Sequence, residues 1–183
     1  MFTDGRSKKV IFLAHCLLNQ NAISDGTAVY PAAFCELIEL LLSKQIGIVQ
    51  LPCPELCCLG LDRGDVHGAE RPVTVENTHI RAQMLLPDEQ AKLKLLVDNV
   101  MHQIREYRKH GFEILGIVGA NRSPNCGVDT TSAENVELVG RGVFMDALYT
   151  ELAAENINIH MIGLKGSDDL SEKLGKLLAE ERL

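Results

Sequence analysis

The sequence predicts a three-layer α/β fold with a mostly parallel sheet of about four or more strands, flavodoxin-like or Rossmann-like. Short apolar runs alternate with longer segments of helical periodicity, which is the pattern of strands joined by crossover helices. The apolar residues of the predicted strand Phe112–Gly119 suggest burial on both faces, as expected of a parallel strand that helices cover on both sides. With 183 residues the chain can bury one sizeable core, so we expect a single domain over residues 1–183.

The first half of the chain contains two predicted strands, a helix and a long loop. Val10–Ala14 and Ile46–Leu51 are short apolar runs that predict buried strands. Between them, Val29–Ser43 has apolar residues spaced for one face of a helix. Cys53–Val73 is rich in Gly, Asp and Arg and predicts a loop of the length that is often functional.

The second half alternates in the same way. Pro87–His110 is the clearest helix, because Pro87 suits the first turn and the apolar residues after it form one stripe. Asn121–Arg141 is polar and predicts an irregular loop. The remaining predicted elements are strands over Phe112–Gly119 and Ile157–Leu164 and helices over Val143–Glu155 and Asp168–Glu181, the last of them capped by Ser167.

Composition argues against two classes of partner. The net charge is −7, aromatic residues make up 4% and Trp is absent, so we expect no nucleic-acid partner. The first apolar run is too short for a signal peptide, and no run of about 18 apolar residues predicts a membrane span. We therefore expect a cytoplasmic protein without a membrane partner, and one that can form a homodimer.

Six cysteines are present: Cys16, Cys35, Cys53, Cys57, Cys58 and Cys126. In a reducing cytosol disulfides are poor explanations for them, which leaves metal ligation, catalysis or core packing. Cys35 lies on the predicted helix among apolar neighbours, and we expect it to be a small buried hydrophobe. Cys57 and Cys58 either join a metal site or simply line the loop.

Three of the cysteines lie just past the ends of predicted strands. Cys16, Cys53 and Cys126 each follow a different strand, and ligands of open α/β sheets bind beyond the carboxyl ends of the strands. The three thiols are expected to meet in one crevice there. Their separation in sequence is unlike the closely paired ligands of a zinc knuckle. Three thiolates suit a soft metal or a cubane iron–sulfur cluster.

Polar residues beside these cysteines are candidates for the chemistry. Glu55 could move protons, or it could cap a helix or pair with Arg63. Ser123 could donate a hydrogen bond or form a turn. His15 either contacts a substrate or is a core histidine. Asn19 is a candidate substrate contact, and Arg63 is a candidate for holding an anionic group of the substrate.

Three motifs occur in order at these strand ends: Cys16-Leu17-Leu18, Cys53-Pro54-Glu55 and Ser123-Pro124-Asn125-Cys126-Gly127. In this the chain resembles the bacterial and archaeal thiouracil desulfurase family, formerly a domain of unknown function. The resemblance implies a [4Fe-4S] cluster on the three cysteines, with one iron left open to bind sulfur. It also implies non-redox removal of sulfur from a small thiolated, thio-nucleobase-like compound, with Glu55 transferring protons and Ser123 assisting.

The chain resembles a divergent member of that family. Asn19-Gln20-Asn21-Ala22 stands near the place of the family's Arg-Tyr-Asp-Gly, and Cys57-Cys58 replaces its Gly-Gly. Because these changes lie where substrate is held, we do not extend thiouracil itself to this chain. Two other functions stay open: a zinc- or sulfur-binding sensor or carrier, and a metal-free nucleotide-binding module. Against the latter, no Gly-rich phosphate loop follows the first predicted strand.

Overall fold

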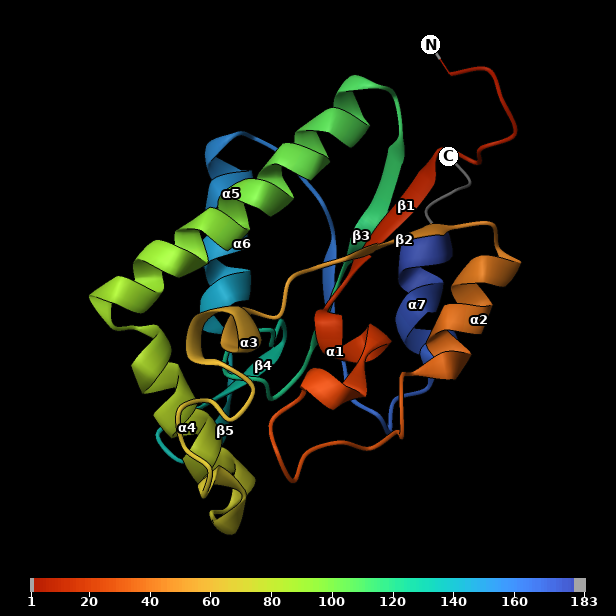
Figure 1. Ribbon diagram of the computed structural model, residues 1–183. Helices are drawn as coiled ribbons and strands as arrows, with labels where there is room; N and C mark the ends of the chain where they lie inside the picture. Colours follow the sequence, from red (N-terminus) through yellow and green to blue (C-terminus); the bar gives the residue numbers. More distant parts are fainter. Residues whose placement is uncertain (1, 180–183) are drawn as a thin grey trace.

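A computed structural model describes residues 2–179 and contains the predicted parallel sheet (Figure 1). Four strands pair in parallel in the order β2-β1-β3-β6. This is the start of the flavodoxin-like strand order. A separate antiparallel hairpin holds β4 and β5. The strands are β1 Lys9–Leu13, β2 Gly47–Gln50, β3 Glu113–Ala120, β4 Thr130–Ala133, β5 Val136–Val139 and β6 Met161–Leu164.

Helices cover both faces of the sheet, which confirms the three-layer α/β class (Figure 1). Helices α5 and α6 lie together on one face, and α2 and α7 lie on the other. Helices α3 and α4 pack beside α5 near the ends of the strands. The helices are α1 His15–Leu18, α2 Cys35–Ser43, α3 Pro54–Leu59, α4 Val73–Met84, α5 Pro87–Lys109, α6 Val143–Ala154 and α7 Leu170–Ala179, with 3₁₀ turns at Gln20–Ala22 and Gly68–Glu70.

The core lies between the sheet and its helices. Phe12, Leu13 and Ile117 on the two central strands are fully buried. This is why those strands read as continuous apolar runs rather than alternating ones. The stripe of α5 that includes Leu93 and Ile104 packs into the same core. No helix among residues 2–179 is long and apolar enough to span a membrane.

Two predicted boundaries are wrong for local reasons. The helix predicted over Val29–Ser43 begins only at Cys35: Pro31 disfavours the helical conformation of Tyr30, and the backbone that follows bonds to the segment after β1, with Gln20 N donating to Ala32 O and Phe34 N donating to Leu17 O. The strand predicted over Ile157–Leu164 pairs with β3 only from Met161 onward. The last helix is capped by Asp169, whose Oδ1 accepts a hydrogen bond from Ser171 N at 2.8 Å, and not by Ser167. The predicted end of that helix at Glu181 lies outside the described residues.

Both predicted loops contain regular structure. Within Cys53–Val73, Pro54 starts α3 as its first helical residue, a position where the missing N–H does no harm. Within Asn121–Arg141, strands β4 and β5 form a hairpin. Its two turn residues, Glu134 and Asn135, have φ values of 53° and 63°, which are the left-handed conformations of a tight hairpin turn. A turn of this kind usually contains a glycine that makes it recognisable in the sequence, and this one contains none.

Candidate metal centre

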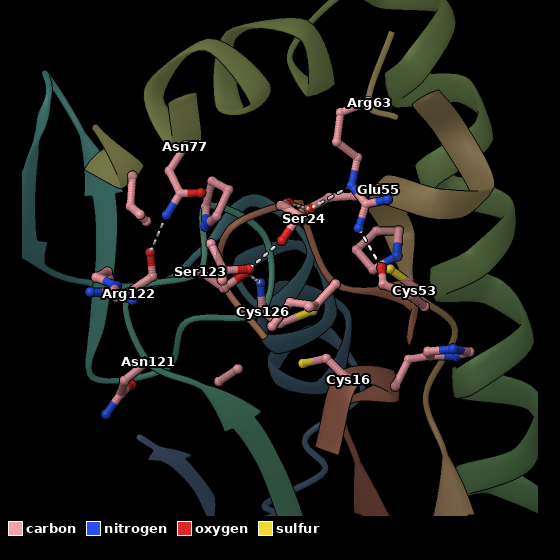
Figure 2. Close-up of a pocket in the computed structure, with 18 residues that line it drawn as sticks. Cys16, Ser24, Cys53, Glu55, Arg63, Asn77, Asn121, Arg122, Ser123 and Cys126 are labelled. Atoms are coloured by element: carbon pink, nitrogen blue, oxygen red, sulfur yellow. Dashed lines mark hydrogen bonds and ion pairs between the residues drawn. The ribbon is translucent and has the colours of Figure 1, made fainter. Parts of the chain in front are cut away.

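Three thiols from three strand ends line one cavity of about 100 Å³ (Figure 2). Cys16 lies in the short helix that follows β1, Cys53 caps the helix that follows β2, and Cys126 lies in the loop after β3. Strand β2 pairs with one edge of β1, and β3 pairs with the other edge. The connections after β1 and after β2 therefore lead to opposite sides of β1, and the cavity lies at this switch point of the sheet. The structure thus brings the three cysteines together.

Burial controls the protonation of these thiols. It raises the pKa of Cys16 to about 12, with the neighbouring Cys53 and Glu55 adding to the effect. Burial likewise raises the pKa of Cys53, and it raises the pKa of Cys126 well above its ordinary value. The thiols are therefore neutral near pH 7 when no cation is bound. A metal that ligates them must displace their protons.

The loop that presents Cys126 is held from several sides. Ser123 Oγ accepts hydrogen bonds from the backbone N–H of Asn125 at 3.2 Å and of Cys126 at 2.9 Å. The loop also packs against two glycines: a Cβ on Gly119 would lie 2.3 Å from Cys126 O, and one on Gly142 would lie 2.4 Å from the backbone of Asn125. Only glycine permits both approaches. The position of the third thiol is therefore fixed by packing as well as by hydrogen bonds.

Glu55 is buried beside the cysteines and is held by three chain segments. Its Oε2 accepts hydrogen bonds from Ser24 Oγ at 3.2 Å and Arg63 Nε at 3.0 Å. Its Oε1 accepts one from Asn125 Nδ2 at 3.0 Å. The carboxylate is therefore oriented by the turn before α2, by the loop after α3 and by the Cys126 loop. The alternative in which Glu55 pairs with Arg63 is confirmed.

The Arg63 guanidinium donates most of its hydrogen bonds to other groups of the protein. Besides its bond to Glu55, it donates to the carbonyl oxygens of Gly60 at 3.1 Å, Leu61 at 2.8 Å and Ala22 at 2.5 Å. The residue lines the cavity but is only 4% exposed. Four of its N–H groups thus already have protein acceptors, so its evident role is to hold Glu55. Contact with an anionic substrate stays a prediction.

His15 lines the cavity, whereas Asn19 does not. The Gln50 side-chain amide contacts His15 Nδ1, while Nε2 of His15 is buried and has no hydrogen-bond partner among residues 2–179. Burial lowers the pKa of His15, and the positive charge of Arg63 adds to the shift. Asn19 Oδ1 instead accepts a hydrogen bond from Asn21 N at 3.1 Å. This closes a turn outside the two cavities around Cys16.

The other cysteines lie outside the cavity. Cys57 is exposed, and Cys58 is buried in the hydrophobic core, where its carbonyl oxygen accepts a hydrogen bond from Lys92 Nζ at 3.1 Å. The expectation that Cys35 is buried is wrong. It occupies the first turn of α2 on the side away from the buried Leu37 and is exposed.

A second cavity of about 430 Å³ adjoins the first. Cys16 and Arg122 line both, and Tyr30 and Phe34 form an apolar wall with their rings stacked 4.7 Å apart. Its size lies in the range of small-molecule sites. Sequence reasoning missed Arg122, Ser24 and Asn77 as lining residues. None of the three lies in a motif, and the helix of Asn77 was not predicted at all.

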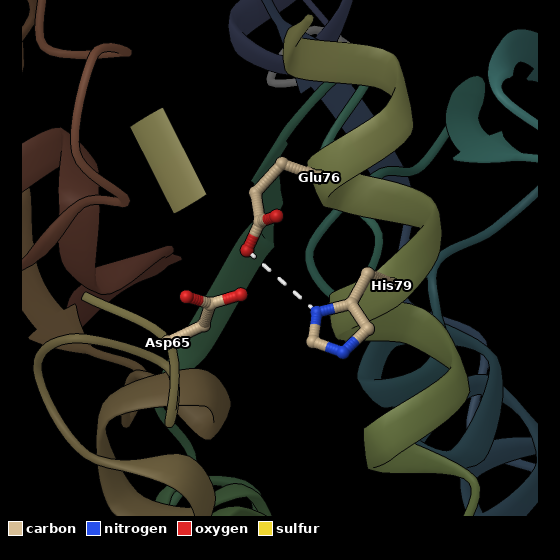
Figure 3. A group of neighbouring side chains, drawn as sticks. All are labelled: Asp65, Glu76 and His79. Atoms are coloured by element: carbon tan, nitrogen blue, oxygen red, sulfur yellow. Dashed lines mark ion pairs between the residues drawn. The ribbon is translucent and has the colours of Figure 1, made fainter. Parts of the chain in front are cut away.

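A second group of titratable side chains lies apart from the cysteines (Figure 3). Ligand atoms of Asp65, Glu76 and His79 lie within 4.8 Å of one another. However, Arg71 donates to Asp65 Oδ2 at 2.6 Å and to Glu76 Oε2 at 2.5 Å. The carboxylates of Asp65 and Glu76 therefore already share the positive charge of the Arg71 guanidinium. The cluster fastens the segment around Gly68 to α4, which carries part of the cavity wall.

Cys58 gives the metal-free protein a measurable pH dependence. Burial raises the pKa of its thiol from 9.0 to about 11, so the folded state keeps a proton that the unfolded chain has lost. Stability should therefore fall as pH rises from about 9 to 11, with a slope of up to about 1.4 kcal/mol per pH unit from this group. Urea denaturation across this range should show a shallower decline in Cys58→Ala. An unchanged slope would contradict the assignment.

The fold and the site together define a three-layer α/β protein with a cysteine-lined cavity at the switch point of its sheet. No family model matches the chain. An uncharacterized protein of Methanocaldococcus jannaschii is 29% identical over 157 residues, covering 86% of either chain. Among solved structures, the [4Fe-4S]-dependent thiouracil desulfidase TudS matches with a TM-score of 0.50 and 15% identity, over 93% of this chain and 99% of that one. This likeness establishes a shared fold.

Proposed function

We propose that this protein is an iron–sulfur-dependent desulfidase that removes sulfur from a small thiolated compound without a redox step. The observation that carries the proposal is the meeting of Cys16, Cys53 and Cys126 in one cavity beside a buried carboxylate. The shared fold with a [4Fe-4S]-dependent desulfidase supports it. Cytoplasmic location and homodimer formation stay predictions.

Three thiolates are soft donors that suit a cubane iron–sulfur cluster, and the metal content of the protein distinguishes such a cluster from the zinc-binding sensor or carrier.

Cys16, Cys53 and Cys126 would hold the cluster, which when bound supplies an open iron that acts as a Lewis acid toward sulfur. The reaction replaces the thiocarbonyl sulfur by the oxygen of water and releases hydrosulfide, so carbon keeps its oxidation state. Ser123 Oγ lines the cavity and accepts two backbone hydrogen bonds, which leaves its own proton to be donated to the substrate. Glu55, held by Ser24 and Arg63, accepts the proton of the attacking water.

The direct test is turnover by anaerobically purified protein. With 4-thiouracil and a simple thioamide as separate substrates, we expect equal amounts of hydrosulfide and oxygenated product from at least one of them. In ¹⁸O-labelled water the product should gain one labelled oxygen atom. Tight binding without hydrosulfide release would instead favour the sensor or carrier function, and binding of nucleotides to metal-free protein in calorimetry would favour the nucleotide module.

A further inference from the structure

Asn77 places a buried amide in the wall of the cysteine-lined cavity. It lies on α4 and is only 7% exposed, yet it lines the same cavity as the three thiols. Figure 2 shows its nitrogen turned away from the cavity and its oxygen turned toward the interior, where Ser24 and Ser123 lie. A buried polar group that faces a cavity is expected to have a hydrogen-bond partner.

The nitrogen and the oxygen of the Asn77 side-chain amide differ in their hydrogen bonds. Asn77 Nδ2 donates to Ser132 Oγ at 3.2 Å and to Arg122 O at 3.4 Å, which fixes which atom is nitrogen and which is oxygen. Asn77 Oδ1 accepts a hydrogen bond from no residue between 2 and 179, and it is not sealed away from the cavity. The side chain is thus anchored through its donor and offers a free acceptor.

The other side-chain amide that lines the cavity, Asn121, has its oxygen occupied, because Oδ1 accepts hydrogen bonds from the backbone N–H groups of Asp129 at 3.0 Å and of Thr130 at 3.3 Å. Glu55 Oε2 already accepts two hydrogen bonds, from Ser24 and Arg63, and Oε1 accepts one from Asn125, which leaves one lone pair for the attacking water of the proposed reaction. Ser123 Oγ already accepts two backbone hydrogen bonds and is left as a donor. Asn77 Oδ1 is thus an anchored acceptor in the cavity wall that no donor among residues 2–179 occupies and that the proposed reaction does not use.

We propose that Asn77 Oδ1 accepts a hydrogen bond from an N–H group next to the thiocarbonyl carbon of the substrate. The protein thereby selects thiolactams and thioamides that carry this N–H, and it selects their thione tautomer, because the thiol tautomer lacks the proton. An analogue methylated at that nitrogen leaves Oδ1 without a donor and places a methyl group against it. This specificity rests on the proposed function for its thiolated substrate.

The experiment compares probes with and without the N–H. Binding of uracil and 3-methyluracil to the anaerobic protein is measured by calorimetry, and kcat/KM is measured for 4-thiouracil and 3-methyl-4-thiouracil. The wild type should prefer each N–H compound by about 10- to 100-fold, the range of one buried hydrogen bond. In Asn77→Ala the preference should fall to about threefold or less, because both the acceptor and the obstacle to the methyl group are gone.

Two control variants separate recognition from structure. Ser132→Ala removes an anchor of the amide nitrogen but keeps Oδ1, and Asn99→Ala removes an exposed amide from α5. Asn99→Ala should keep the wild-type preference, whereas Ser132→Ala should keep only part of it, because Arg122 O still accepts a hydrogen bond from Asn77 Nδ2. Loss of the preference in Asn99→Ala, or its persistence in Asn77→Ala, would overturn the assignment. If no thiolated compound loses sulfur but uracil binding keeps its N–H preference, the proposed reaction fails while the role of Asn77 stands.

Discussion

Replacing Cys126 by serine is expected to lower the rate of sulfur release by at least about a thousandfold, because a lost cluster removes several kcal/mol of Lewis-acid stabilisation. Cys16→Ser and Cys53→Ser should behave alike, since all three thiols line the same cavity. Hydrosulfide release by each anaerobic variant, measured alongside its far-ultraviolet circular dichroism, distinguishes a lost centre from a lost fold.

The chain contains its own matched controls for these variants. Cys35 and Cys57 are free, exposed and outside the cavity. Their serine variants should keep activity within about twofold, as substitutions away from structural features usually do. If Cys57→Ser is as inactive as Cys53→Ser, Cys57 belongs to the centre and the ligand set is wrong. Activity near the wild-type level in Cys126→Ser would contradict the proposed mechanism.

Arg63→Met is expected to lower the free energy of unfolding by about 3–5 kcal/mol, because it leaves the Glu55 carboxylate buried without its counter-ion. The two side chains are 3% and 9% exposed and their charged atoms lie 3.0 Å apart. Three backbone carbonyls lose their donor at the same time. Urea denaturation of the wild type and the variant under identical conditions gives the difference.

An exposed ion pair, Arg105 with Glu155, serves as the comparison for the buried pair of Glu55 and Arg63. Arg105 contacts Glu155 at 3.1 Å, but the two side chains are 48% and 33% exposed. Arg105→Met should therefore cost no more than about 1 kcal/mol. Adding Glu55→Gln to Arg63→Met should recover part of the loss, since the uncompensated charge is removed. Equal losses in Arg63→Met and Arg105→Met would mean that burial of the Glu55–Arg63 pair has no energetic consequence.

The sheet could be predicted because its signal is local. Val10–Ala14 and Phe112–Gly119 are apolar runs, and parallel strands buried on both faces have that pattern. The hairpin could not be predicted, because three of the four residues of Thr130–Ala133 are polar and Val136–Val139 lies on the surface, so neither strand has a buried apolar pattern. Helix α4 was also missed. Its buried residues include Glu76, which pairs with Arg71, and Asn77, whose partners Arg122 and Ser132 are 45 and 55 residues away in the sequence.

The positions of the three cysteines followed from the sheet, since the carboxyl ends of parallel strands meet at one edge. The hydrogen-bond partners of Glu55 could not be predicted from the sheet. Ser24 is 31 residues from Glu55 and Asn125 is 70 residues from it, so their hydrogen bonds to that carboxylate exist only in the folded chain. Arg63 was correctly placed beside the site, but the acceptors of its guanidinium were visible only in the structure.

The most direct test of the central claim is the iron and acid-labile sulfide content of protein purified without oxygen. We expect about four iron atoms and four sulfides per chain, with a brown colour and absorbance near about 400 nm, as for a cubane cluster. All of these should be lost in the triple Cys16→Ser, Cys53→Ser, Cys126→Ser variant. Stoichiometric zinc without sulfide, or an iron content that persists in the triple variant, would contradict a cluster held by these three cysteines.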